Sequence, residues 1–71
     1  MKDTEQARNF IETTLNGLEK SVTEKDNAGI NNSRQRFNTL LTEYKNIIGT
    51  KSVNAYTQNY AEIMKKGGYL R

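Results

Sequence analysis

The sequence predicts a small all-α protein, a three-helix bundle whose helices run up, down and up. Three observations predict it. Proline is absent, apolar residues recur every three or four positions in three segments, and glycine or asparagine stands between those segments. Proline would break a helix interior, and the observed spacing places apolar side chains on one helical face. We expect a single domain over residues 1–71, with helices at about 4–25, 32–48 and 53–66.

The first predicted helix is indicated by a long apolar stripe. Its members are Ala7, Phe10, Ile11, Leu15, Leu18 and Val22. Asp3 is the expected N-cap, and Gln6 three residues later completes a capping-box pattern. Gly17 weakens a helix interior by about 1 kcal/mol relative to alanine. The apolar stripe continues across this glycine, so we expect one continuous helix.

The second predicted helix has the clearest stripe in the chain. It is formed by Phe37, Leu40, Leu41, Tyr44, Ile47 and Ile48. The segment before it breaks the apolar pattern, and there Gly29 suits a left-handed C-cap of the first helix. Asn31 or Asn32 suits the N-cap of the second helix, and Gly49 is expected to end it.

The third predicted helix has a narrower and more aromatic stripe. It is formed by Val53, Tyr56, Tyr60, Ile63 and Met64. Thr50 or Ser52 can cap its start, and the pair Gly67-Gly68 is expected to end it.

Two further expectations concern how this helix packs. Tyr69 and Leu70 can fold back onto its last turn as the hydrophobic contact that accompanies glycine C-caps. Short connections make sequential helices antiparallel neighbours, which gives the up-down-up bundle. The alternative is a hairpin of the first two helices, with the third helix packed on a partner or on a second copy of the chain.

The composition argues against an enzyme, a metal centre and a disulfide framework. The chain has no cysteine and no histidine, so the commonest general base, the best nucleophile and the ligands that zinc prefers are all absent. Carboxylate pairs such as Glu12 with Glu19 lie on a polar helix face, where solvation is the expected state. We therefore expect a non-enzymatic protein that uses no cofactor.

The charge is distributed unevenly along the chain, whose net charge is +3. Residues 1–26 carry four basic and six acidic groups, a net charge of −2, whereas residues 27–71 carry seven basic and two acidic groups, a net charge of +5. One interpretation is an electrostatic footprint for an anionic partner. The other is an acidic helix that lies beside a basic hairpin and partly neutralises it.

The leading hypothesis is a helical module that binds a larger protein as a regulator, inhibitor, adaptor or assembly subunit. Tyrosine and arginine are favoured at protein interfaces, and the second half of the chain is rich in aromatic and basic residues. The candidate contact residues are Arg34, Arg36, Lys51, Tyr56, Tyr60, Lys65, Lys66, Tyr69 and Arg71. For the tyrosines, packing in the core with the hydroxyl at its rim is the competing role.

Nucleic-acid binding by the basic half is a second hypothesis. The stretch from Gly49 onward resembles the glycine turn and second helix of a helix-turn-helix, and its polar residues could reach bases and phosphates. These residues are Lys51, Asn54, Thr57, Gln58 and Asn59. Two features depart from the motif: Thr50 stands where such turns usually place an apolar residue, and the preceding helix is longer than usual.

A third hypothesis is a self-assembling structural subunit, because a chain of this length buries a small core and homo-oligomers offset that weakness. It predicts oligomers with Ile47, Ile48, Tyr69 or Leu70 at the contact. We expect no membrane partner, since the longest apolar runs are dipeptides such as Ile47-Ile48. The residues after Met1 lack the apolar core of a signal peptide, so we expect a cytoplasmic location.

Overall fold

The computed structural model describes residues 2–69, and these residues form two α-helices and no strand. Helix α1 spans Lys2–Thr23 and helix α2 spans Asn27–Lys66. The prediction of an all-α fold is confirmed. Helix α2 bends inside its length at Gly49, whose φ of 88° and ψ of 160° are not helical. We call residues 27–48 of α2 the N-arm and residues 50–66 the C-arm.

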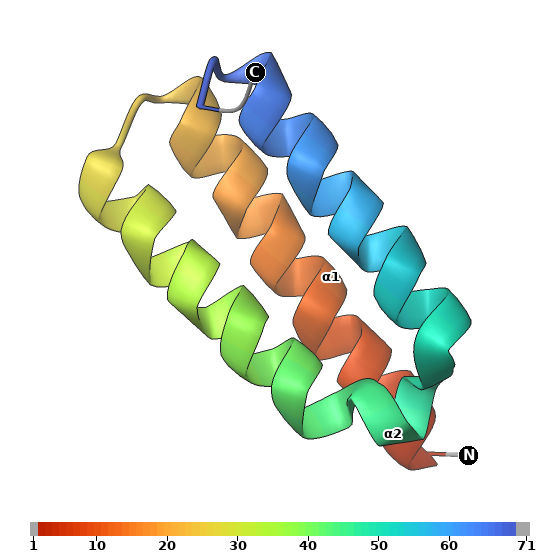
Figure 1. Cartoon of the computed structure of the whole chain (residues 1–71). Helices are drawn as coiled ribbons and strands as arrows, with labels where there is room; N and C mark the ends of the chain where they lie inside the picture. Colours follow the sequence, from red (N-terminus) through yellow and green to blue (C-terminus); the bar gives the residue numbers. More distant parts are fainter. Residues whose placement is uncertain (1, 70–71) are drawn as a thin grey trace.

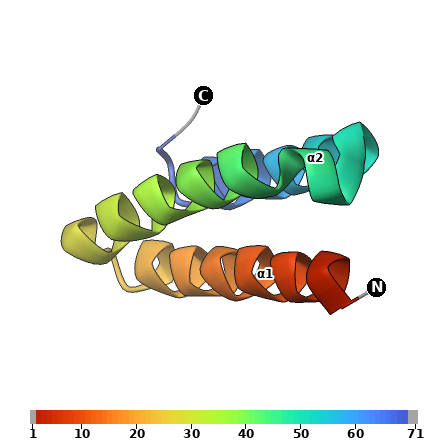
Figure 2. The same ribbon diagram turned by 90° about the horizontal axis from the view of Figure 1, so that it is seen from below.

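The bend folds the two arms of α2 back along α1. Figure 1 shows α1 running between the two arms, with the bend at the end of the molecule where α1 begins. Figure 2 shows the arms in one layer and α1 in a second layer against them. The C-arm therefore lies along α1 of its own chain.

All three segments contribute side chains to one core. Its buried apolar members are Ala7, Ile11, Leu15, Leu18, Val22, Ile30, Phe37, Ile48, Ile63 and Met64. The rings of Phe37 and Tyr60 stack with their centroids 4.8 Å apart and their planes 6° from parallel, which joins the two arms. The predicted stripe of α1 is buried with one exception, because Phe10 is 45% exposed.

The connection between α1 and α2 is shorter than predicted. Lys25 takes a left-handed conformation with φ of 57°. The amide of Asp26 then donates to the carbonyl of Ser21 at 2.9 Å, and the amide of Lys25 donates to the carbonyl of Val22 at 3.2 Å. This pair of hydrogen bonds is the Schellman motif that ends many helices.

The predicted C-cap at Gly29 and N-cap at Asn31 or Asn32 are wrong. Helix α2 is capped by Asp26, whose carboxylate accepts a hydrogen bond from the amide of Gly29 at 3.2 Å. Gly29 lies at a close approach instead, since a Cβ atom there would lie 2.5 Å from Oγ of Ser21 and 2.6 Å from Oδ2 of Asp26, and both side chains would have to shift. The glycine allows the start of α2 to approach the end of α1.

The predicted N-cap at Asp3 lies inside a helix. Helix α1 begins at Lys2, so Asp3 is in its first turn, where a carboxylate complements the helix dipole. Helical structure resumes directly after Gly49, so Thr50 and Ser52 lie in the first turn of the C-arm. The positive φ of Gly49 places the break where the glycine pattern predicted it.

The predicted end at Gly67-Gly68 is confirmed. Gly67 is the C-cap of α2 and Gly68 has a φ of 83°. The amide of Tyr69 donates to the carbonyl of Met64 at 2.9 Å, which forms a second Schellman motif. Tyr69 is 41% exposed, and Leu70 lies outside the described residues.

Candidate interaction surface

Three of the predicted contact residues have partners within the chain. Nε of Arg34 donates to the hydroxyl of Tyr60 at 2.9 Å, which ties the N-arm to the C-arm. The hydroxyl of Tyr56 donates to Oε2 of Glu12 at 2.8 Å, which ties the C-arm to α1. These side chains therefore hold the three segments together.

Tyr56 belongs to a small polar cluster between α1 and the C-arm. Burial, the hydrogen bond to Glu12 and the negative charge of Glu12 raise the pKa of Tyr56 to about 12, against a smaller opposing effect of Arg8. Nη2 of Arg8 donates to Oγ of Ser52 at 3.3 Å. Arg8 and Glu12 are four residues apart on α1, as Ser52 and Tyr56 are on the C-arm, so two successive turns of each helix face each other.

The predicted basic contact residues of the C-arm lie at its two ends. Lys51 follows the bend, whereas Lys65 and Lys66 lie in the last turn. The fourteen-residue interval between Lys51 and Lys65 corresponds to about 21 Å of helix and returns to the same side. Arg71 lies outside the described residues.

The two arms do not have the geometry of a helix-turn-helix. That motif joins a short first helix to a second at roughly 90–120°. The N-arm and C-arm instead both run back along α1, one on each side of it in Figure 1 and in one layer above it in Figure 2.

An apolar surface lies where α1 meets the N-arm. Phe10 and Ile47 are each 45% exposed, and with Tyr69 they are the large hydrophobic side chains most open to solvent among the described residues. The ring of Phe10 stacks on that of Tyr44 with centroids 6.5 Å apart. Beside this pair is a cavity of about 360 Å³, lined by Phe10, Thr13, Thr14, Arg36, Leu40 and Tyr44.

Ile47 continues this surface along the N-arm. It follows Tyr44 by three residues and Leu40 by seven, so the three side chains share one side of the helix. We call the surface formed by Phe10, Arg36, Leu40, Tyr44 and Ile47 the Phe10 face.

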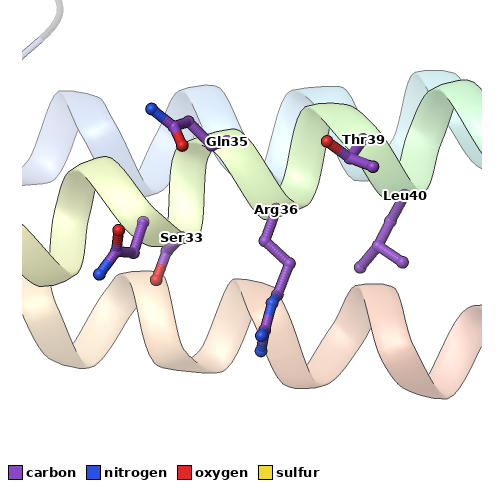
Figure 3. A pocket seen from close by; sticks show the side chains of 6 residues that line it. Ser33, Gln35, Arg36, Thr39 and Leu40 are labelled. Atoms are coloured by element: carbon purple, nitrogen blue, oxygen red, sulfur yellow. The ribbon is translucent and has the colours of Figure 1, made fainter.

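A hollow of about 690 Å³ adjoins the Phe10 face at its other end. It is lined by Asn32, Ser33, Gln35, Arg36, Thr39 and Leu40 (Figure 3). In Figure 3 Leu40 and Ser33 point toward α1, and the long side chain of Arg36 reaches across it. Arg36 and Leu40 line both spaces, so the cavity and the hollow are neighbours on this surface.

The apolar pattern places Phe10 and Ile47 on the core side of their helices. Of the Phe10 face, Arg36 is a predicted contact with a protein partner and Ile47 a predicted contact between copies of a self-assembling subunit. A signal for the two exposed residues was present. Each directly precedes another large apolar residue, Ile11 or Ile48. Neighbouring side chains on a helix point about 100° apart. In each pair one side chain can therefore lie in the core while the other lies at its edge.

Comparison with known proteins gives no relative from which to infer a role. The chain matches no protein-family model, no curated protein and no solved structure at a significant level. Within residues 2–69, no three His, Cys, Asp or Glu side chains gather as a metal site would require. Neither helix of the described part of the chain is long and apolar enough to cross a membrane.

Proposed function

We propose that this chain is a small non-enzymatic module that binds a protein partner through the Phe10 face. The observation that carries the proposal is the exposure of Phe10 and Ile47, both 45% exposed, on either side of Tyr44, whose ring stacks on Phe10 and which precedes Ile47 by three residues. Adjacent exposed apolar side chains mark interaction sites in small proteins, whereas scattered ones are ordinary.

The chemistry of the Phe10 face suits a protein contact. Aromatic residues and arginine dominate binding energy at interfaces, and here the stacked pair of Phe10 and Tyr44 lies beside Arg36. Completing the burial of one large apolar side chain stabilises a complex by about 1–2 kcal/mol. Neither the cavity nor the hollow has His or Cys among its lining residues, and their polar groups are hydroxyls, amides and one guanidinium.

Site-specific photo-crosslinking in the source cells tests the proposal. A photoreactive phenylalanine analogue replaces Ile47, and the matched control replaces Asn59, which is exposed on the C-arm. We expect protease-sensitive adducts of defined mass from position 47 and none from position 59. Equal adducts from both positions, or none from position 47, would contradict the proposal.

We also propose that the two arms of α2 act as separate helices of an up-down-up three-helix bundle. The non-helical backbone of Gly49 and the burial of Ile63 and Met64 support this proposal. If the arms are separate helices, inserting Gly-Ser after Gly49 lengthens a loop, which costs less than about 1 kcal/mol. Urea unfolding checks this expectation, and the loss of cooperative unfolding would contradict it.

Nucleic-acid binding by the C-arm is the second candidate function. It is favoured by the exposed side of the C-arm, where Lys51, Gln58 and Lys65 share one face at heptad spacing. Three phosphate contacts would give a salt dependence with a logarithmic slope of about −2 to −3. Titration of labelled DNA at several salt concentrations measures this slope, and Lys51→Ala should reduce its magnitude by about 1.

A further inference from the structure

The surface features of the N-arm also identify the kind of partner, an inference that rests on the proposed function of the Phe10 face. We propose that the partner is a second copy of this chain. The two copies pack their N-arms antiparallel across a two-fold axis that passes beside Leu40.

The first argument is charge. Arg36, Leu40, Glu43 and Ile47 follow one another at spacings of four, three and four residues, so they form a single stripe along the N-arm. Arg36 and Glu43, both exposed, lie at equal distances on either side of a point between Thr39 and Leu40, about 10.5 Å from each other along the helix.

A two-fold axis through that point makes these charges complementary. In the antiparallel pair, Arg36 of each copy faces Glu43 of the other, so two opposite-charge pairs flank the two Leu40 side chains. A two-fold interface brings the same patch of both copies together and must be self-complementary. The stripe is self-complementary in this sense. Binding to an unrelated protein would not require the stripe to complement itself.

The second argument is shape. Ile47 lies about 11 Å from the axis point along the helix, and Asn32 lies about 11 Å from it in the other direction. Asn32 lines the hollow of about 690 Å³. The two-fold axis therefore sets Ile47 of one copy against the hollow of the other, and each copy supplies one exposed apolar side chain and one hollow.

The third argument is the size of the chain. Domains of about 60 residues bury roughly 60% of the surface that their unfolded chains expose, so their stability is marginal. Oligomerisation is a common remedy in small proteins that lack disulfides and metals. This chain has 71 residues and no cysteine, and the Phe10 face leaves two large apolar side chains for a second copy to cover.

A charge-swap experiment on the full chain tests the proposal. Analytical ultracentrifugation is used to measure the mass of the wild-type chain over a wide range of concentrations. We expect a monomer–dimer equilibrium. Either single substitution, Arg36→Glu or Glu43→Arg, should raise the dissociation constant of the dimer at least tenfold, which is about 1.4 kcal/mol. Each one places two pairs of like charges across the interface. The double variant Arg36→Glu/Glu43→Arg should restore the dimer.

The matched control is Lys45→Glu, the same change of charge on the opposite side of the N-arm, which should leave the dimer unchanged. Circular dichroism verifies that every variant folds. A wild-type chain that stays monomeric at all concentrations, or a double variant as weak as either single one, would overturn the inference. If crosslinks from position 47 to another protein persist with a monomeric chain, the proposed function stands without this inference; if they are absent as well, both fail.

Discussion

Individual side chains decide where this chain turns, and Lys25 shows the energetic consequence. Its φ of 57° lies in the left-handed region, which costs an L-residue with a side chain roughly 1–2 kcal/mol. Glycine is the usual residue at this position of a Schellman motif. It removes the steric cost but enlarges the entropy of the unfolded chain by about 0.4–1 kcal/mol.

We therefore expect Lys25→Gly to stabilise the fold by about 0.5–1 kcal/mol, the difference between these effects. In a chain of this length that change raises Tm by about 2–8 °C. Thermal unfolding followed by circular dichroism measures it. The control is Lys20→Gly in the last turn of α1, where glycine should cost up to about 1 kcal/mol. Destabilisation by both substitutions would contradict the expectation.

Tyr56 makes the fold sensitive to alkaline pH. Its pKa is raised to about 12 in the folded chain, from 10.0 for an ordinary tyrosine. A raised pKa means that the folded state favours the neutral phenol. The stability contribution is therefore complete below pH 10 and is lost as the pH rises from about 10 to about 12.

The titration of Tyr56 can be separated from that of the other tyrosines by comparison with a variant that lacks it. The ultraviolet absorbance of phenolate is recorded against pH for the wild-type chain and for Tyr56→Phe, and the second curve is subtracted from the first. We expect a midpoint close to 12 in the native chain and close to 10 in urea. A native midpoint near 10 would show that the hydrogen bond to Glu12 is not kept in solution.

At the level of helices, the sequence predicts those helix ends and breaks that depend on local chemistry. Apolar spacing and glycine punctuation locate α1 to within two residues, the break at Gly49 and the end at Gly67. The start of α2 escapes prediction for two physical reasons. A lysine in the left-handed conformation has no sequence signal, and the role of Gly29 lies in its close approach to Ser21, which is a tertiary contact.

The candidate interaction surface is less predictable than the helices. Periodicity assigns a residue to the apolar side of a helix but does not say how far around that side the neighbouring helix reaches. Phe10 and Ile47 lie at the margins of their stripes, and only the packing of α1 against the N-arm leaves them exposed. Arg34, Tyr56 and Tyr60 show the converse, because hydrogen bonds between segments engage them within the chain.

The bend in α2 depends on one glycine. At Gly49, φ of 88° and ψ of 160° lie in a region that is open essentially to glycine alone. Gly49→Ala should therefore destabilise the fold by about 1–3 kcal/mol, although no atom lies within 4 Å of the added Cβ. Gly17→Ala is the matched control, because the nearest atom to its Cβ is 3.9 Å away and its backbone is helical.

The two alanine substitutions should change the free energy of unfolding in opposite directions. Gly17→Ala should stabilise α1 by up to about 1 kcal/mol through helix propensity. Urea unfolding of both variants gives the free energies. If Gly49→Ala were as stable as the wild-type chain, the bend would not need a glycine, and the assignment of the two arms as separate helices would lose its main support.

For the molecule as a whole, folding and the proposed self-association depend on side chains that are neighbours in sequence. Ile11 is fully buried between the three segments, whereas Phe10 beside it is 45% exposed on the Phe10 face. A chain of 71 residues has a total unfolding free energy of about 4–10 kcal/mol. Ile11→Ala should remove about 2–5 kcal/mol of it by leaving a cavity, enough to populate the unfolded chain.

Phe10→Ala should instead cost little folding stability and weaken the proposed self-association. In the monomer it removes the stacking on Tyr44 and part of one apolar contact, a loss of about 1 kcal/mol, so the chain stays folded. In the proposed dimer it removes a contact at the interface. A partner that binds only the folded chain raises its apparent stability. Tm of the wild-type chain should therefore rise with protein concentration. Tm of Phe10→Ala should be lower and nearly independent of protein concentration. Thermal unfolding over the concentration range of the ultracentrifugation measures both slopes. Equal slopes for the two chains would mean that the exposed phenylalanine serves the core alone.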